Sequence, residues 1–257
     1  MNDPFQQHGV KNLSASSINE YIANPARWIL HVSGFRDRQG VPAMWRGIAV
    51  DKALSRAAFE QSISEAQILQ WAIDEFDARY DAAQSADVII SQKKAESERE
   101  SLARFLQPAI SHFRELGIPQ ATQKKIELQF EELPIPIIGY LDLLYDGVVR
   151  DIKSVNRLPS KVPDATSRQL AIYAYAEECT PVIDYVHATK TQSQVVVKPV
   201  LDIEHHMMVV RRAALNMMNL LSYSSDIQQV ASLLVPDLDD WRWSDGEREA
   251  ARELWRI

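Results

Sequence analysis

Two aspartates and one lysine flank a short turn signal in the middle of the chain. Asp142 lies before Asp146-Gly147, and Asp151 and Lys153 lie after it. An Asp-Gly pair between two apolar runs is the strongest local signal for a two-residue β-hairpin with a type I′ turn. In that register Asp142 faces Asp151 across the hairpin, and Lys153 shares their face because side chains alternate along a strand.

This arrangement points to metal-assisted chemistry on a phosphate. Two facing carboxylates repel each other, and a divalent cation between them offsets the repulsion. Hard oxygen ligands suit Mg²⁺ or Mn²⁺. Lys153 can then hold an attacking water or the negative charge that develops on a phosphoryl group. An alternative stays open, in which Asp142 or Asp151 faces solvent and Lys153 simply pairs with one of them.

The elements that must position these residues are helical, then β-rich, then helical again. Periodicity predicts helices over 43–59, 66–82, 95–116 and 165–178 and from 204 onward, and strands over 125–130, 137–145, 148–153, 182–189 and 194–201. Capping boxes are expected at Ser17–Glu20 and Ser244–Glu247. We predict one α+β or α/β/α domain over 1–257, with a mainly helical part (13–118), a catalytic α/β core (119–201) and C-terminal helices (202–257).

Composition excludes several classes of protein. The chain has 257 residues, of which 46% are hydrophobic and 25% charged, as in ordinary globular proteins. Its one cysteine, Cys179, cannot form an internal disulfide, a thiolate zinc site or an iron–sulfur cluster held by cysteines. None of its 8 glycines precedes a lysine, so it has no P-loop and no ATPase motor. No apolar run is long enough for a membrane span and the start lacks a signal-peptide pattern, so we expect a cytoplasmic protein without a membrane partner.

Net charge at first argues against a nucleic-acid ligand. The chain carries 28 basic and 35 acidic side chains, a net charge of −7. The stretch around and after the hairpin is nevertheless locally basic, through Arg150, Arg157, Lys161 and Arg168. We expect these four residues to contact DNA, which reconciles the acidic total with a polyanionic substrate.

Four segments together resemble one enzyme family. Gly139-Tyr140-Leu141-Asp142 followed by Asp151-Ile152-Lys153-Ser154 resembles the core of the PD-(D/E)xK nucleases, most closely the RecB-like branch. The segment from Leu13 to Trp28 is similar to the opening segment of that branch, with Pro25 in place. Arg46 to Leu54 resembles its Gly-x-x-x-His helix, and Gln169 to Tyr173 its Gln-x-x-x-Tyr motif. The resemblance covers about residues 13–190.

The resemblance implies a restriction-endonuclease-like α/β/α core with a central mixed sheet and additional N- and C-terminal helices. It also implies a metal-dependent DNA nuclease, an exonuclease acting in recombination, repair or phage DNA processing. The residues implied are Asp142, Asp151 and the Ile152 carbonyl as ligands of Mg²⁺ or Mn²⁺, Lys153 for the attacking water, and Gln169 and Tyr173 to orient Lys153 or a DNA phosphate.

This sequence departs from the family pattern at two positions. Asp51 stands where the family has histidine, and because a carboxylate also binds Mg²⁺ we expect Asp51 to complete the metal shell. Asn24 stands where iron–sulfur members carry a cysteine, so no iron–sulfur cluster is expected.

The expected partner is DNA, with a helicase, annealing or other recombination protein as a further possibility; the oligomeric state is not predicted. Two other functions stay open. One is a non-catalytic DNA-binding or assembly subunit that keeps the nuclease fold. The other is a phosphoesterase for small phosphate esters, for which the sequence has no motif of its own.

Overall fold

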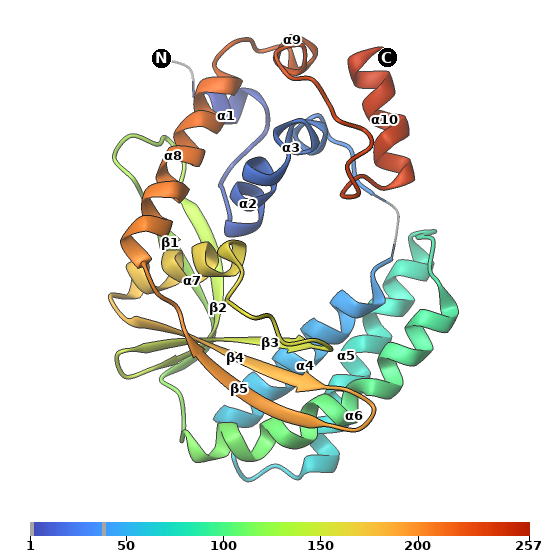
Figure 1. Cartoon of the computed structure of the whole chain (residues 1–257), viewed down its shortest axis with the longest axis vertical. Helices are drawn as coiled ribbons and strands as arrows, with labels where there is room; N and C mark the ends of the chain where they lie inside the picture. The colour runs from blue at the N-terminus through green and yellow to red at the C-terminus, as the bar shows by residue number, and fades with distance from the viewer. Residues whose placement is uncertain (1–2, 38–39) are drawn as a thin grey trace.

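A computed structural model describes residues 3–37 and 40–257, and its centre is a mixed five-stranded sheet (Figure 1). The strands lie in the order β1 (Ala121–Leu128), β2 (Ile137–Tyr145), β3 (Val148–Val155), β4 (Thr180–Ala188) and β5 (Ser193–Pro199). Neighbouring strands are antiparallel except β3 and β4, which are parallel. Helix α7 (Asp164–Glu177) connects these two strands, because parallel neighbours need a crossover rather than a tight turn.

One face of the sheet is covered by a three-helix layer. It consists of α4 (Pro42–Phe59), α5 (Glu65–Ser85) and α6 (Gln92–Glu115), which lie together in Figure 1. Phe105 and Phe113 of α6 share a core with Ile152 of β3 and Val186 of β4. Burial of these apolar side chains fixes α4 and α6 against the strands that carry the candidate site.

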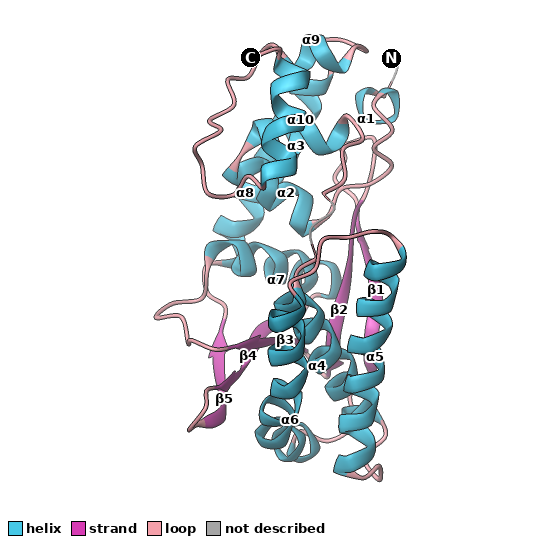
Figure 2. Cartoon of the chain, turned by 90° about the vertical axis from the view of Figure 1, so that its right-hand side faces the viewer, coloured by secondary structure: helices cyan, strands magenta, loops and turns pink. Residues whose placement is uncertain are grey.

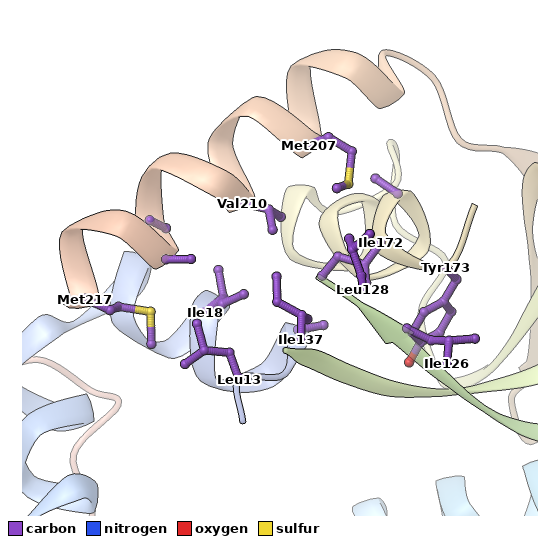
Figure 3. Close-up of a cluster of buried hydrophobic side chains, with 14 of the residues drawn as sticks. Leu13, Ile18, Ile126, Leu128, Ile137, Ile172, Tyr173, Met207, Val210 and Met217 are labelled. Atoms are coloured by element: carbon purple, nitrogen blue, oxygen red, sulfur yellow. The ribbon is translucent and has the colours of Figure 1, made fainter. Parts of the chain in front are cut away.

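The opposite face is covered by α7, on which α8 (Ile203–Leu221) and α2 (Ala15–Ala23) pack. Of the other N-terminal helices, α1 (Pro4–Gln7) packs on α8 and α3 (Pro25–Val32) packs on α2. Figure 3 shows Met207, Val210 and Met217 of α8 directed toward Ile18 of α2 and Ile172 of α7. This apolar cluster joins the N-terminal helices to the sheet.

The C-terminal segment packs on α3. It contains α9 (Ile227–Ala231) and α10 (Asp245–Trp255), and Figure 2 shows both beside α3 at the end of the molecule remote from α6. Glu247 of α10 accepts hydrogen bonds from Arg27 and His31 of α3, each at 2.9 Å. Burial alone lowers the pKa of His31, but its contacts with Glu20 and Glu247 outweigh this effect and raise the pKa to about 9. The contacts with His31 and Arg27 lower the pKa of Glu247 to about 2 against the effect of its burial.

The predicted fold class is confirmed, with corrections in local detail. Strand 137–145 and the capping box of Ser244 and Glu247 occur as predicted. The box predicted at Ser17–Glu20 is wrong: Ser14 caps α2, and Ser17 is its third helical residue. No helix among the described residues is both long and apolar enough to cross a membrane.

The hairpin turn keeps its predicted two-residue length but not its predicted type. Tyr145 pairs with Val148 around Asp146-Gly147. Gly147 has a φ of +67°, whereas Asp146 does not have a positive φ. A type I′ turn requires positive φ at both central residues, so the type I′ prediction is wrong.

Candidate active site

The sheet forks at the candidate site. The pairing of β2 with β3 ends at Leu143 and Arg150, although β1 and β2 stay paired as far as Leu128 and Ile137, and β3 and β4 as far as Val155 and His187. The two pairs of strands therefore separate, as their different directions in Figure 1 show. The predicted hairpin register holds next to the turn, but the direct pairing of Asp142 with Asp151 does not occur.

A side chain replaces the missing strand partner. Oδ2 of Asp142 accepts a hydrogen bond of 2.7 Å from the backbone N–H of Ile152. The N–H and C=O of one strand residue point to the same edge, so the Ile152 carbonyl also faces the fork. Asp142 is 8% exposed and Asp151 is fully buried, so both carboxyl groups lie inside the protein.

Lys153 and Asp51 complete the charged group at the fork. Nζ of Lys153 lies 2.8 Å from Oδ2 of Asp151, which confirms that these two residues share a face of β3. Asp51 projects from α4 and accepts hydrogen bonds from Ser55 Oγ at 3.1 Å and from Gln123 Nε2 at 3.2 Å.

Burial and mutual repulsion control the protonation of the carboxyl groups. Burial, and then the charge of Asp151, raise the pKa of Asp51 to about 6. Burial also raises the pKa of Asp142 well above its usual range, and the charges of Asp51 and Asp151 add to this effect. Burial alone lowers the pKa of Lys153, but the Asp151 and Asp142 carboxylates outweigh it, so the net shift is upward. Lys153 is therefore a permanent cation at neutral pH.

The donor set fits a hard divalent cation. The available atoms are carboxylate oxygens and a backbone carbonyl, which are ligands that Mg²⁺ and Mn²⁺ prefer. Oδ2 of Asp151 is buried and, despite its proximity to Lys153, accepts no well-directed hydrogen bond from any described residue. Within residues 3–37 and 40–257, however, no three Asp, Glu, His or Cys side chains form a group that could hold a metal ion. The three-carboxylate shell expected from Asp51, Asp142 and Asp151 is thus not preformed.

Comparison with known proteins identifies the family. A model of the PD-(D/E)XK nuclease superfamily matches residues 12–232, which is most of the chain. The chain belongs to the PD-(D/E)XK nuclease superfamily. Its mixed sheet between helical layers is the restriction-endonuclease-like core expected from the resemblance.

The solved structure of SSO0001 is similar at 16% sequence identity and a TM-score of 0.31, over 45% of this chain and 60% of that one. The match thus spans less than two thirds of the SSO0001 chain. None of the curated proteins matches significantly.

A glycine of the nuclease core explains the position of Tyr173. Gln169 Nε2 donates a 2.9 Å hydrogen bond to Tyr173 Oη, so the two residues share a face of α7 as predicted. A Cβ atom on Gly139 would lie 2.5 Å from Cε1 of Tyr173. Burial, with a smaller effect of Asp151 and Asp142, raises the pKa of Tyr173 to about 12. Gly139 therefore admits a ring that stays neutral beside the carboxyl groups.

Of the four basic residues expected at DNA, Arg150 is largely buried. Arg150 is engaged within the protein: it donates two hydrogen bonds, of 2.7 and 2.8 Å, to the buried Asp184, which also contacts His112 of α6. Its side chain is only 11% exposed, so the expected DNA contact by Arg150 is not supported. The ion pair forms because Asp184 needs a partner in the core.

The other three basic residues lie nearer the surface. Arg157 is exposed in the loop after β3. Lys161 is 81% exposed and lies 3.6 Å from Asp164. Arg168 is bonded to Asn19 of α2.

Sequence reasoning missed three polar residues at the fork: Arg46, Ser55 and Gln123. Ser55 carries a detectable signal, because it lies four residues after Asp51 and so on the same helix face. Arg46, which binds the backbone of β3, directly precedes Gly47 in the motif of α4. Gln123 has a φ of +49°, for which its local sequence contains no signal.

Proposed function

We propose that this chain is a metal-dependent deoxyribonuclease that hydrolyses phosphodiester bonds through the residues of the fork. The superfamily supports nuclease activity on DNA. The observation that carries the site assignment is the Asp142 carboxylate bound to the Ile152 N–H, beside the Asp151–Lys153 pair, where β2 and β3 separate.

In this proposal Asp142, Asp151 and the Ile152 carbonyl hold Mg²⁺ or Mn²⁺, and Asp51 supports the shell from α4. When bound, the cation polarises the phosphoryl group and lowers the pKa of water. The mutual repulsion that adds to the raised pKa of Asp51 and of Asp142 would be offset by a cation held at these residues. The proposal places the chain in the RecB-like branch without an iron–sulfur cluster, because Asn24 stands where iron–sulfur members carry a cysteine.

Lys153 acts as a charge and not as a base. Its raised pKa keeps the ammonium protonated, so it donates hydrogen bonds to the attacking water or to a phosphate oxygen. A fixed cation at this place stabilises the negative charge of the transition state. Gln169 and Tyr173 orient Lys153 or the DNA phosphate from α7.

The proposal extends to the biological setting. The resemblance to the RecB-like branch favours an exonuclease in recombination, repair or phage DNA processing, working in the cytoplasm with a helicase or annealing partner. Exposed Arg157 and Lys161, with Arg168, remain the proposed contacts to the DNA backbone.

The decisive assay uses end-labelled linear and circular DNA with Mg²⁺, Mn²⁺ or EDTA. The wild type should degrade linear DNA only with the cation. Asp151→Ala and Lys153→Ala should each abolish cleavage, but only Asp151→Ala should weaken Mn²⁺ binding, because an ammonium is not a ligand. Asp245→Ala, at a carboxylate of α10 that is 94% exposed, is the matched control and should behave as the wild type.

Two results would select the other functions. DNA binding without cleavage under every cation would indicate a non-catalytic DNA-binding or assembly subunit. Hydrolysis of a chromogenic phosphate ester without degradation of DNA would indicate a phosphoesterase. Cleavage of DNA by both Asp151→Ala and Lys153→Ala at the wild-type rate would refute the site assignment.

A further inference from the structure

The fork leaves one edge of β3 without a strand partner. Beyond Arg150 the backbone groups of β3 that would have paired with β2 need other partners. The N–H of Ile152 points to this edge, since it binds Asp142, and so does the backbone of Ser154 two residues further on. The groups to account for are therefore the carbonyl of Ile152 and both the N–H and the carbonyl of Ser154.

Arg46 supplies the partner for Ser154. Its Nη2 donates a 3.2 Å hydrogen bond from α4 to the Ser154 carbonyl. Its Nη1 lies 2.5 Å from Oε2 of Glu98 on α6, and its guanidinium carbon lies 4.4 Å from the centre of the Phe105 ring. Arg46 thus joins α4, α6 and β3 at the level of the fork.

The burial of this arginine is costly for the protein. Arg46 is 5% exposed, and its Nε–H has no acceptor among the described residues. Apolar side chains of similar volume often replace buried ion pairs without loss of stability. A buried guanidinium with an unused donor is therefore better explained by what it does to β3 than by what it adds to stability.

We propose that Arg46, oriented by Glu98, is a positioning residue that keeps the edge of β3 open for the metal and fixes Lys153. Asp142 holds β3 at Ile152 and Arg46 holds it at Ser154, so the two contacts bracket Lys153. The Ile152 carbonyl lies on the same edge and faces the carboxylates. This inference rests on the proposed nuclease function, and Arg46 touches neither metal nor DNA in it.

The test compares three variants by Mn²⁺ calorimetry and by kcat and KM on linear DNA. Arg46→Met keeps the apolar stem and removes the hydrogen bonds, whereas Arg46→Lys keeps the charge. Arg56→Met is the matched control, since Arg56 lies on the same helix and is 53% exposed. Groups that orient metal ligands typically change metal affinity or activity about 10- to 100-fold when removed.

We expect Arg46→Met to weaken Mn²⁺ binding about 10-fold and to lower kcat by a similar factor with little change in KM. Arg46→Lys should recover part of both, and Arg56→Met should match the wild type. A folded Arg46→Met with wild-type Mn²⁺ affinity and kcat would overturn the proposal and leave Arg46 as a structural link. If Arg46→Met fails to fold, Glu98→Ala provides the same comparison, because it removes the partner that orients Arg46.

Hydrogen exchange separates this inference from the proposed function. If the wild type neither binds Mn²⁺ nor cleaves DNA, the proposed function fails, but the open edge of β3 can still be measured. Amides of 151–155 should exchange faster in Arg46→Met than in the wild type, while those of β5 stay unchanged. Unchanged exchange over 151–155 would overturn the role of Arg46 on β3 itself.

Discussion

Replacement of Gly139 by alanine tests the packing between β2 and α7. The new Cβ would lie 2.5 Å from Cε1 of Tyr173, where ordinary carbon contacts are about 3.5–4 Å. Gly139 does not have a positive φ, so alanine fits its backbone and the cost is steric. Tyr173 is 4% exposed and has little room to move. The ring must therefore shift by about 1 Å.

The magnitude follows from these contacts. Overpacking of a core costs about 1–3 kcal/mol. Alanine also lowers the conformational entropy of the unfolded chain relative to glycine, which offsets about 0.4–1 kcal/mol of this steric cost. We expect Gly139→Ala to lower the free energy of unfolding by about 1–2 kcal/mol. Each kcal/mol lost should lower the Tm by about 2–4 °C. Displacement of Tyr173 by about 1 Å should also slow DNA cleavage, up to about 100-fold.

Urea unfolding and single-turnover cleavage measure the two effects, and Gly47→Ala is the control. A Cβ on Gly47 would lie 3.8 Å from Ser154 Oγ, an ordinary contact, and alanine favours a helix by about 0.8–1 kcal/mol over glycine. Gly47→Ala should therefore be at least as stable and as active as the wild type.

A double-mutant cycle identifies the clashing atom. Leucine at position 173 lacks Cε1, so Gly139→Ala should cost at least about 1 kcal/mol less in a Tyr173→Leu background. Wild-type stability and rate in Gly139→Ala, or an equal cost in both backgrounds, would refute this account of the glycine.

Three further outcomes follow from the charged groups. The pKa of Asp51 is raised to about 6, so the folded chain holds this proton more tightly than the unfolded chain, and stability falls as pH rises from about 4 to 6. In urea unfolding with EDTA, Asp51→Asn should therefore stabilise the metal-free protein at pH 8 but not at pH 4. Destabilisation by Asp51→Asn at pH 8 would contradict this. His31, with its pKa raised from 6.5 to about 9, contributes stability below pH 6.5 that is lost as pH rises to about 9, whereas Glu247, with its pKa lowered from 4.5 to about 2, contributes stability above pH 4.5 that is lost as pH falls toward 2. Hydrogen exchange of α10 should therefore be slowest, relative to a Glu247→Gln variant, between pH 4.5 and 6.5. A difference between the two proteins that does not depend on pH would argue against these ion pairs. Asp184→Ala should lower the free energy of unfolding by about 3–5 kcal/mol, because it leaves the buried Arg150 without its partner. Arg150→Met should leave the salt dependence of DNA binding unchanged. A shallower salt dependence in Arg150→Met would show that Arg150 contacts DNA.

Much of the fold was predictable because it depends on local patterns. The apolar run over 137–145 predicted β2 with its observed bounds, and the Asp146-Gly147 pair predicted the hairpin and its register next to the turn. The alternation of side chains placed Lys153 with Asp151 on one face of β3. The helical spacing of Gln169 and Tyr173 likewise predicted their contact.

Local patterns failed where a competing contact was available. Ser17 and Glu20 satisfy the capping-box pattern, but Ser14 lies one position before the first helical residue and forms the box with Ser17 instead. Arg150 lies in a basic stretch, which predicted that it contacts DNA. The buried Asp184, distant in sequence, takes its guanidinium instead.

By itself the sequence determined the family, the hairpin and the identity of the charged residues, since these depend on residue types and short spacings. Only the tertiary structure decided how the charged residues meet. Asp142 binds the Ile152 N–H instead of pairing with Asp151, and Arg46 reaches the Ser154 carbonyl from a helix far away in the chain. The physical reason is that β2 and β3 separate after Leu143 and Arg150, which leaves backbone groups without strand partners. Periodicity shows which face a side chain takes, but the place where a ladder ends depends on packing from both sides of the sheet.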